Sequence, residues 1–419
     1  MLPRLTPALA LLLALAGPAA QAQTAAAPAA AAASAPTLRA EVAKPLQAAQ
    51  EAIKAGRYAD ALARVAEAEA VPNLSAYEAF IALRVKAPVA FGNGDAAGAL
   101  AQFEQVLDSP LLPAADRPAL TETVIKLALQ QKDYPRAGRW LKRYIADGGG
   151  NAELLRVHPQ VLSVLGDHAG VVAWLTPRLQ AEAAAGRAPA EDALRLLAAS
   201  QGALKDMAGY TATLQQLAAS TGKPDYWQEL VARTVRREGF AEERWRLDVY
   251  RLRRALGLAL NAAELGDMAW RANQAGLPAE AQALLDEGFG SGLLGKDANA
   301  DADRKLREAA TKAAAQDRAG AAEGEAAALK AKDGNAAQGL GLALSGAGEH
   351  ARALKLLAAA QDKGGLRRPD EARLHLAVAQ WRAGQADAAR RSLAHVQGGD
   401  GAADLARLWT LFLDSPARK

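Results

Sequence analysis

Histidine is the side chain best suited to acid–base or metal chemistry near neutral pH, and the 419-residue sequence contains five. They are His158, His168, His350, His375 and His395. No two of them stand four residues apart, the spacing that places two metal ligands on one face of a helix. His375 and His395 are close enough in sequence to approach each other, but two ligands alone make a poor metal site. We therefore predict that the chain holds no metal.

Residues that could act as nucleophiles or phosphate ligands also lack the neighbours they need. The sequence has no cysteine, and nothing around Ser163 resembles the strained turn of a catalytic serine. The glycine-rich residues 288–292 lack the Lys-Ser/Thr pair and the preceding strand of a P-loop, so we predict a loop between two structural repeats. No carboxylate pair has a recognisable glycosidase setting, and Glu69, Glu242 and Glu243 are predicted to lie on helix surfaces. The sequence thus predicts no catalytic residue, no cofactor and no enzymatic activity.

Basic and aromatic residues could instead bind macromolecules. Lysine and arginine number 50 against 46 acidic residues, a net charge of +4, and the two signs are interspersed. The one basic cluster, Arg251, Arg253 and Arg254, is therefore predicted to be a solvated helix face rather than a nucleic-acid surface. The seven tryptophans are predicted to fill the core, with one or two lining a groove. They are Trp140, Trp174, Trp227, Trp245, Trp270, Trp381 and Trp409.

Composition favours helices as the elements that carry these residues. The chain is 51% hydrophobic but only 5% aromatic, and strong helix formers, led by alanine, greatly outnumber the residues that favour strands. Without cysteine there can be no disulfide, so stability must come from packing. A chain of this length can bury a large core. We predict an all-α fold.

The N-terminus has the three-part layout of a secretory signal peptide. Arg4 is the only early charge, an apolar run follows, and the small-residue motif Ala20-Gln21-Ala22 forms a cleavage site. We predict a signal peptide over residues 1–22, with an uncleaved membrane anchor as the alternative. Residues 23–37 are an Ala/Pro tract that cannot bury a core and are predicted to be a disordered linker. No later segment could span a membrane, so we expect the mature protein in the periplasm of a Gram-negative bacterium.

A short phrase recurs along the chain and predicts a helical repeat. It consists of a Gly or Lys, a polar residue, often an aromatic, two variable residues, and a small residue that opens an apolar helix. The clearest copy runs from Gly56 through Tyr58 to Ala61. His168 and His350 stand in the aromatic slot, so we predict that they pack between helices. Other copies start at Gly94, Lys132, Gly166, Lys205, Gly239, Gly276, Gly348 and Gly384, and a degraded copy is predicted near Gln316 and Asp317.

The spacing of these copies predicts the architecture. Successive copies start 32 to 40 residues apart, close to the roughly 34-residue period of tetratricopeptide repeats. In each unit the glycine would end the first helix in a left-handed conformation, and the small residue would let the second helix pack closely against it. One hairpin cannot bury its own apolar face, whereas about ten stacked hairpins can. We therefore predict a right-handed α-solenoid of tetratricopeptide-like repeats over residues 38–415.

Prolines and glycine clusters add local expectations. Pro135 and Pro278 fall in the first turn of a predicted second helix, where the missing N–H is tolerated. Pro88 falls inside a predicted first helix and is expected to kink it or shift its start. Breaks between units are predicted at residues 147–150, 220–222 and 363–365.

Four stretches also carry a resemblance to a known family. They are residues 75–78 (Ser-Ala-Tyr-Glu), 132–137 (Lys-Asp-Tyr-Pro-Arg-Ala), 224–227 (Pro-Asp-Tyr-Trp, with Leu230 following) and 364–369 (Gly-Gly-Leu-Arg-Arg-Pro). Over most of residues 38–396 the chain resembles periplasmic tetratricopeptide-repeat proteins described as components of TonB systems, which couple energy to outer-membrane receptors. It departs from them where Ala96 and Ala386 replace aromatics. Residues 296–334 keep almost no large side chains, which puts one repeat in doubt.

The resemblance and the repeat together predict a function in binding. The resemblance implies a role beside TonB-type complexes and supplies no catalytic residue. We expect a non-catalytic periplasmic scaffold whose concave surface, lined by the first helices, binds a segment of a partner protein in the cell envelope. Nucleic acid is not expected as a partner. Two alternatives stay open: a scaffold for envelope polysaccharide export or assembly, and the helical scaffold of a cell-wall lytic enzyme.

Overall fold

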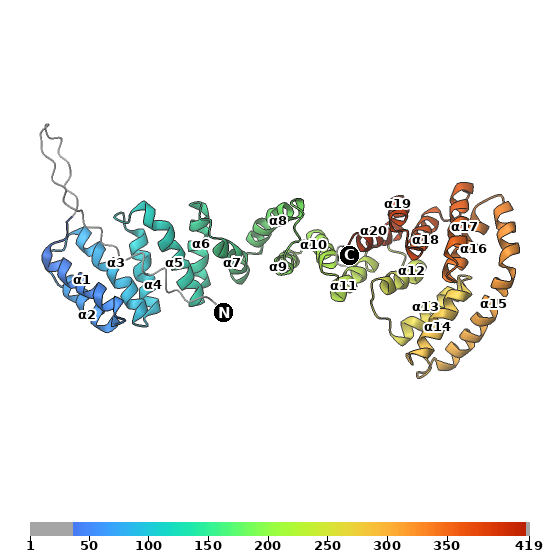
Figure 1. Ribbon diagram of the computed structural model, residues 1–419, viewed down its shortest axis with the longest axis horizontal. Helices are drawn as coiled ribbons and strands as arrows, with labels where there is room; N and C mark the ends of the chain where they lie inside the picture. The colour runs from blue at the N-terminus through green and yellow to red at the C-terminus, as the bar shows by residue number, and fades with distance from the viewer. Residues whose placement is uncertain (1–36, 416–419) are drawn as a thin grey trace, which may run out of the picture. The chain divides into compact units, whose positions relative to one another are not determined.

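The computed structural model describes residues 37–415, and within them the regular structure is helical (Figure 1). The predicted signal peptide, residues 1–22, and all but the last residue of the predicted linker lie outside the described residues. Among the described residues, no helix is both long enough and apolar enough to cross a membrane. The described chain forms two compact units, unit 1 up to Pro177 and unit 2 from Arg178.

Most of the helices pair into hairpins, as the repeat predicts. Unit 1 contains α1 (Ala40–Lys54) with α2 (Tyr58–Glu69), α3 (Ala76–Gly92) with α4 (Ala96–Asp108), the short 3-10 helix η2 (Ala114–Asp116), α5 (Arg117–Gln130) with α6 (Tyr134–Ala146), and α7 (Ala152–Val164) with α8 (His168–Ala184), in which the unit boundary falls. Unit 2 contains α9 (Glu191–Ala203) with α10 (Met207–Thr221), α11 (Pro224–Val235) with α12 (Glu242–Ala255), α13 (Ala262–Gln274) with α14 (Pro278–Gly290), α16 (Asn335–Gly346) with α17 (His350–Lys363), and α18 (Pro369–Arg382) with α19 (Ala386–Leu393). Two further helices of unit 2, α15 (Ala300–Lys330) and α20 (Ala402–Asp414), have no hairpin partner of their own. The prediction of an all-helical solenoid of stacked hairpins is confirmed within these units.

The turn phrase has a clear physical basis. Its first residue adopts positive φ and ends the first helix, with φ of 88° at Gly94 and 59° at Lys132. The following aspartate then caps the second helix: the Asp133 carboxylate accepts from the backbone N–H of Arg136 at 3.1 Å, which satisfies one of the unpaired donors at a helix start. The small residue five positions after the turn, such as Ala137, is fully buried between the helices. Each part of the phrase therefore has a separate structural task.

Prolines and glycine breaks mostly fall where predicted. Pro135 lies in the first turn of α6 and Pro278 begins α14. Pro88 lies inside α3, which runs from Ala76 to Gly92, so of the two expected effects the shifted start does not occur. The start is set instead by a capping box, in which the Ser75 side chain and the N–H of Glu78 pair, and the Glu78 side chain accepts from the N–H of Ser75.

The degraded repeat predicted near Gln316 and Asp317 is wrong. Both residues lie in the middle of α15, a single helix of 31 residues. Residues 300–330 are mostly alanine and charged helix formers, and none of them has the positive φ that ends the other first helices. The glycine-rich residues 288–292 are also only partly a loop, because α14 continues to Gly290.

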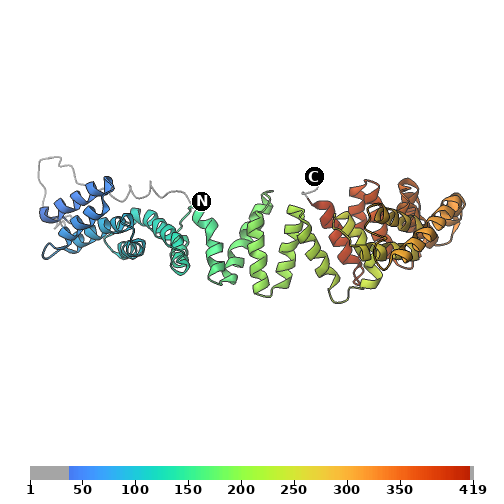
Figure 2. The same ribbon diagram turned by 90° about the horizontal axis from the view of Figure 1, so that it is seen from below.

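Unit 2 closes on itself. Its last helix, α20, packs against α10, α12 and α18, so that the end of the unit returns to its beginning. Figures 1 and 2 both show α20 and α12 lying side by side. Trp409 and Phe412 of α20 are almost fully buried in a core shared with Leu214 of α10 and Trp245 of α12. We call this arrangement of α10 to α20 the ring of unit 2.

Candidate functional site: a charged cavity inside the ring of unit 2

Polar contacts fix the closure of the ring next to the apolar core. The carbonyl of Asp400 accepts from the backbone N–H of Ala241 at 2.7 Å and from the Trp245 indole at 3.1 Å. Arg237, just before α12, pairs with Asp404 of α20 at 2.6 Å. Arg244 of α12 pairs with Asp400 and with Glu371 of α18. The loop before α20 is thus tied to α12. Through Arg244, α12 is also tied to α18.

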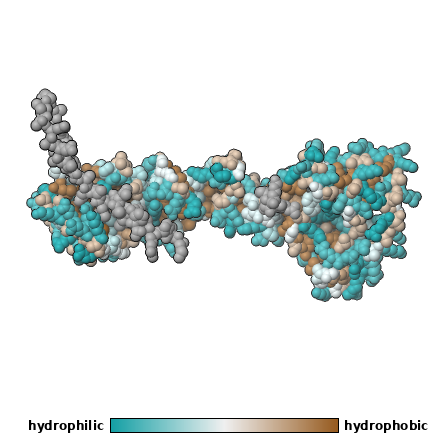
Figure 3. All heavy atoms as spheres, viewed as in Figure 1, coloured by the Kyte–Doolittle hydropathy of each residue, from teal (hydrophilic) through white to brown (hydrophobic). Residues whose placement is uncertain are grey.

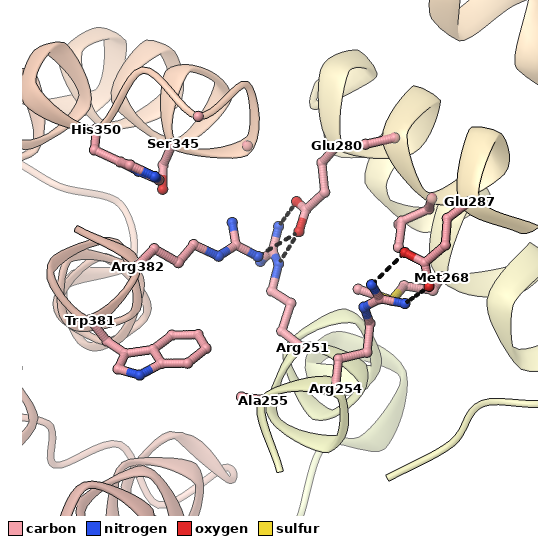
Figure 4. A pocket seen from close by; sticks show the side chains of 14 residues that line it. Arg251, Arg254, Ala255, Met268, Glu280, Glu287, Ser345, His350, Trp381 and Arg382 are labelled. Carbon is pink, nitrogen blue, oxygen red and sulfur yellow. Dashed lines mark hydrogen bonds and ion pairs between the residues drawn. The ribbon is translucent and has the colours of Figure 1, made fainter. Parts of the chain in front are cut away.

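At the centre of the ring lies a buried cluster of charges around Arg251. This residue is 4% exposed and lies on α12, three residues after Asp248. Its guanidinium donates to both oxygens of Glu280 on α14, at 3.0 and 2.5 Å, and to Asp248 at 2.9 Å. Arg382 of α18 donates to Glu280 at 3.0 Å (Figure 4). One arginine therefore bridges two carboxylates, and one of these carboxylates joins α12, α14 and α18.

The cluster extends to a buried histidine. The Nε2 atom of His375 on α18 lies 3.1 Å from Oδ1 of Asp248. Burial alone would raise the pKa of Asp248, but the charges of His375 and Arg251 outweigh it and hold the pKa of this carboxyl well below its usual range. Burial likewise opposes ionisation of Glu280, yet Arg251 and Arg382 lower its pKa to about 2. Both carboxylates are therefore ionised at neutral pH.

A cavity of about 430 Å³ opens beside this cluster. One wall is apolar, formed by Met268 and Leu284, and Trp381 faces it from α18. Figure 4 shows Ser345 and His350 on the same side of the cavity as Arg382, with Arg254 and Glu287 on the other side. The complete lining is Arg251, Arg254, Ala255, Met268, Glu280, Ala283, Leu284, Glu287, Ser345, Gly346, Gly348, His350, Trp381 and Arg382. The first helices of the hairpins (α13, α16 and α18) and the second helices (α12, α14 and α17) both contribute to this lining. The cavity is therefore not lined by first helices alone.

The interpretation of the arginine cluster as a solvated helix face is wrong. Arg251 is buried, whereas Arg253 pairs with Glu264 at 2.6 Å and Arg254 pairs with Glu287 at 2.7 Å. Each guanidinium therefore already faces a carboxylate.

The predictions for the histidines separate into packing and pairing. His375 does not approach His395; it faces Asp248, and His395 Nδ1 lies 2.8 Å from the carbonyl of Arg391. His158 stacks edge-on against Trp174 with ring centroids 4.5 Å apart, which is a packing contact. His168 and His350 are half-buried. Within residues 37–415 no group of three or more histidine or acidic side chains is placed to hold a metal ion.

The tryptophans mostly fill the core. Trp140, Trp227, Trp245 and Trp409 are at most 5% exposed, as predicted. Trp381 is half-buried and lines the cavity. Trp270 is not a core residue either, because half of its surface is exposed on α13. The carboxylates predicted on helix surfaces are there: Glu69, Glu242 and Glu243 are 35%, 55% and 72% exposed.

Sequence reasoning missed the buried charge cluster, although one local signal points to it. Asp248 interrupts an apolar run between Leu247 and Val249, and it stands three residues before Arg251 on the same helix face. A charged pair within a stretch that must pack is expected to be buried and matched. Its partners Glu280 and His375 could not be named this way, since they come from helices far along the chain.

Unit 1 presents a second candidate surface, on its first helices. Its members are counted back from the turn that ends each first helix, and they recur at the same offsets on three successive first helices. Ten residues before the turn stand Arg84 of α3, Glu122 of α5 and Arg156 of α7, and six before it stand Lys126 and Gln160. All five are exposed or half-exposed. We call this set the first-helix row.

The first-helix row is held by side-chain contacts within unit 1. Arg84 pairs with Asp116 at 2.9 Å, and Glu122 accepts from Lys126 at 3.5 Å. Glu122 also accepts from the Tyr144 hydroxyl at 2.7 Å, and burial and this carboxylate raise the pKa of Tyr144. Arg84, Glu122 and Lys126 are therefore held by contacts within unit 1, whereas Arg156 and Gln160 are exposed.

Comparisons with known proteins leave the family open. No protein-family model matches the chain, and no curated protein matches it. Among solved structures, one described as "Structure of Naa15/Naa10 bound to HypK-THB" is 12% identical, with a TM-score of 0.32 and 86% of this chain covered; this chain spans 58% of its length. A structure of the P58(IPK) TPR domain is 13% identical, with a TM-score of 0.22, 91% of this chain covered and all of that domain. The tetratricopeptide-like assignment rests on the hairpins themselves.

Proposed function

We propose that the protein is a non-catalytic scaffold of the bacterial periplasm that binds a segment of a partner protein along the first-helix row of unit 1. The observation that carries the proposal is the row itself: polar and charged side chains recur at the same offsets from the turn on α3, α5 and α7. A regularly spaced set of donors and acceptors suits an extended or helical protein segment.

The surface composition is in keeping with a binding role that relies on polar contacts. Hydrophilic residues cover most of the face drawn in Figure 3, and apolar ones appear in scattered patches. Exposed large apolar residues are few in unit 1, with Val164 and Leu165 at the end of α7 the most exposed pair. These two residues adjoin the row at α7 and could supply the apolar anchor that such interfaces need.

We further propose that the partner belongs to a TonB-type energy-coupling system. Support comes from the signal-peptide pattern of residues 1–22 and from the four stretches that resemble periplasmic TonB-associated repeat proteins. Cell fractionation tests the location: the protein is expected in the periplasmic fraction. Its N-terminus there is expected to follow Ala22. A full-length protein in the cytoplasm would contradict the proposal.

Site-specific photo-crosslinking tests the surface and the partner together. A crosslinker at Gln160, in the row, is expected to capture TonB-system proteins from intact envelopes. The matched control is Lys142, an exposed residue on α6 outside the row, which should give no such adduct. Recovery of glycan-export proteins would favour a scaffold for polysaccharide export, and recovery of a lytic enzyme would favour the helical scaffold of such an enzyme. Equal labelling at both positions would refute binding at the row.

A further inference from the structure

We propose that the cavity of unit 2 binds a small organic carboxylate with an apolar body. The inference concerns a different surface from the first-helix row and does not depend on the partner of unit 1. Its volume of about 430 Å³ falls within the range of small-molecule sites in proteins, about 300–1,000 Å³. A molecule of the size of one or two amino acids fits this space.

The unused hydrogen-bonding capacity of the cavity selects the chemistry of the ligand. Both lining carboxylates are already paired, Glu280 with Arg251 and Arg382, and Glu287 with both terminal nitrogens of Arg254. Arg382 in contrast uses one nitrogen, Nη2, for Glu280, out of a guanidinium with five N–H groups. What remains available is mainly donors, so the ligand must supply acceptor oxygens.

Two neighbouring groups add hydrogen-bonding capacity, and each can donate to a carboxylate, the imidazole through the tautomer with its proton on Nδ1. The Nδ1 atom of His350 is buried and has no hydrogen-bond partner within the described residues, and Ser345, 3% exposed, lines the cavity beside it. Figure 4 shows both on the side of the cavity from which Arg382 extends. A planar carboxylate held by a guanidinium fork, with an imidazole and a hydroxyl near its second oxygen, matches this arrangement.

The charge around the cavity disfavours a ligand with two negative charges. Three arginines and two glutamates line the cavity, and Asp248, which pairs with Arg251, offsets the third arginine. A phosphate dianion would bring two charges beside Glu280 and Glu287, which are both ionised. The remainder of the wall is apolar, with Trp381 opposite Met268 and Leu284. This wall suits an aliphatic or aromatic body that is attached to the carboxylate.

A matched pair of probes tests the proposal. N-acetyl-L-phenylalanine carries the carboxylate and the apolar body, and N-acetyl-L-phenylalanine amide differs only in lacking the charge. Titration calorimetry and saturation-transfer NMR with the whole protein are expected to show binding of the acid and about tenfold or weaker binding of the amide, as expected for loss of a charge-assisted pair. The indole N–H signal of Trp381, assigned with Trp381→Phe, is expected to shift on titration.

Variants separate the site from the fold. Arg382→Gln is expected to lower affinity for the acid about tenfold and to keep the fold, because Glu280 retains both contacts with Arg251. Arg391→Gln, on the exposed surface of α19, is the control and should bind like the original chain. The proposal fails if the acid does not bind, if acid and amide bind equally, or if Arg382→Gln binds normally. Tighter binding of a pentapeptide that ends in phenylalanine would also overturn it, in favour of a protein C-terminus as the ligand.

Discussion

The two units are built from the same hairpin but treat charge in opposite ways. In unit 1 most ion pairs are partly exposed and join near neighbours, such as Arg64 with Glu67, or adjacent hairpins, such as Arg139 with Glu104. In unit 2 the pair of Asp248 and His375 is buried and joins residues 127 positions apart. The difference follows from the path of the last helix, because only unit 2 has a helix that returns to its start.

That return changes what each unit can do. Stacked hairpins with exposed first helices leave a long surface for a protein segment. A ring instead encloses its interior, so polar side chains there must find partners within the protein or in a small ligand. The same repeat thus presents a row of polar side chains in unit 1 and a cavity lined by charged side chains in unit 2.

The largest expected effect comes from opening the ring at its core. Trp409→Ala removes a side chain that is 1% exposed and packs 5.0 Å from Trp381 and 5.5 Å from Phe412, between ring centroids. We expect it to lower the free energy of unfolding of unit 2 by about 3–5 kcal/mol. Hydrogen exchange should become faster in α10, α12, α18 and α20 and stay unchanged in α1 to α6.

Trp270→Ala is the matched control for this variant. Trp270 is 50% exposed on α13, within the same unit, so its removal is expected to change the free energy of unfolding by less than about 1 kcal/mol. Equal losses for Trp409 and Trp270, or a loss of protection shared by unit 1, would show that the ring is not a separately stabilised structure.

The next effect concerns the buried charges. Arg251→Met leaves Asp248 with only His375 and Glu280 with only Arg382, both in a desolvated setting. Removing one partner of a buried ion pair typically costs about 3–5 kcal/mol. Arg64→Met in unit 1 breaks a pair whose side chains are 50% and 53% exposed and is expected to cost at most about 0.5 kcal/mol. Chemical denaturation measures both, and a cost below that of Arg64→Met would show that the cluster does not hold the ring.

Local features of the fold could be predicted from the sequence because their causes are local. The turn at Lys132 is set by a left-handed residue, an aspartate cap and Ala137, all within six positions. The helix starts at Pro278 and Ala76 likewise follow from proline or a capping box. The hairpins and most breaks between them were therefore predictable one at a time.

Ring closure and the candidate cavity were not predictable, for a physical reason. The contact of Arg237 with Asp404 spans 167 positions, and such pairing leaves no periodic trace in the chain. The same distance hid the partners of Arg251, which looked like a surface residue beside Arg253 and Arg254. The prediction of a turn near Gln316 was wrong for the opposite reason. The repeat period suggested a turn there, but the residues are good helix formers and none adopts the left-handed conformation.

Acid should test the buried charge cluster of unit 2 next. The folded-state pKa of Glu280 is lowered from 4.5 to about 2, so its ion pairs stabilise the fold above about pH 4.5 and this contribution is lost as the pH falls towards 2. Asp248 changes in the same direction. We expect the stability of unit 2 to fall through this window, with protection lost in α12, α14 and α18.

Glu280→Gln tests the origin of that acid dependence. It should lower stability at neutral pH, since Arg251 and Arg382 then face an uncharged amide, and should flatten the pH dependence of unit 2 between 4.5 and 2. Glu67→Gln, at a side chain 53% exposed in unit 1, should leave this dependence unchanged. An unaltered acid transition in Glu280→Gln would assign the transition to other carboxylates.

The smallest effect probes whether the unpaired α15 belongs to the cooperative ring. Gly320 lies inside α15 with no atom near enough to contact an added Cβ, so Gly320→Ala should stabilise the helix by about 0.5–1 kcal/mol. Gly341→Ala on α16 is the opposite control, because its Cβ would lie 2.8 Å from Leu357. If the ring unfolds as one unit, Gly320→Ala slows hydrogen exchange throughout unit 2. Stability added to one helix spreads to others only where they unfold together with it. Slower exchange confined to α15 would therefore mean that α15 unfolds independently of the other helices of unit 2.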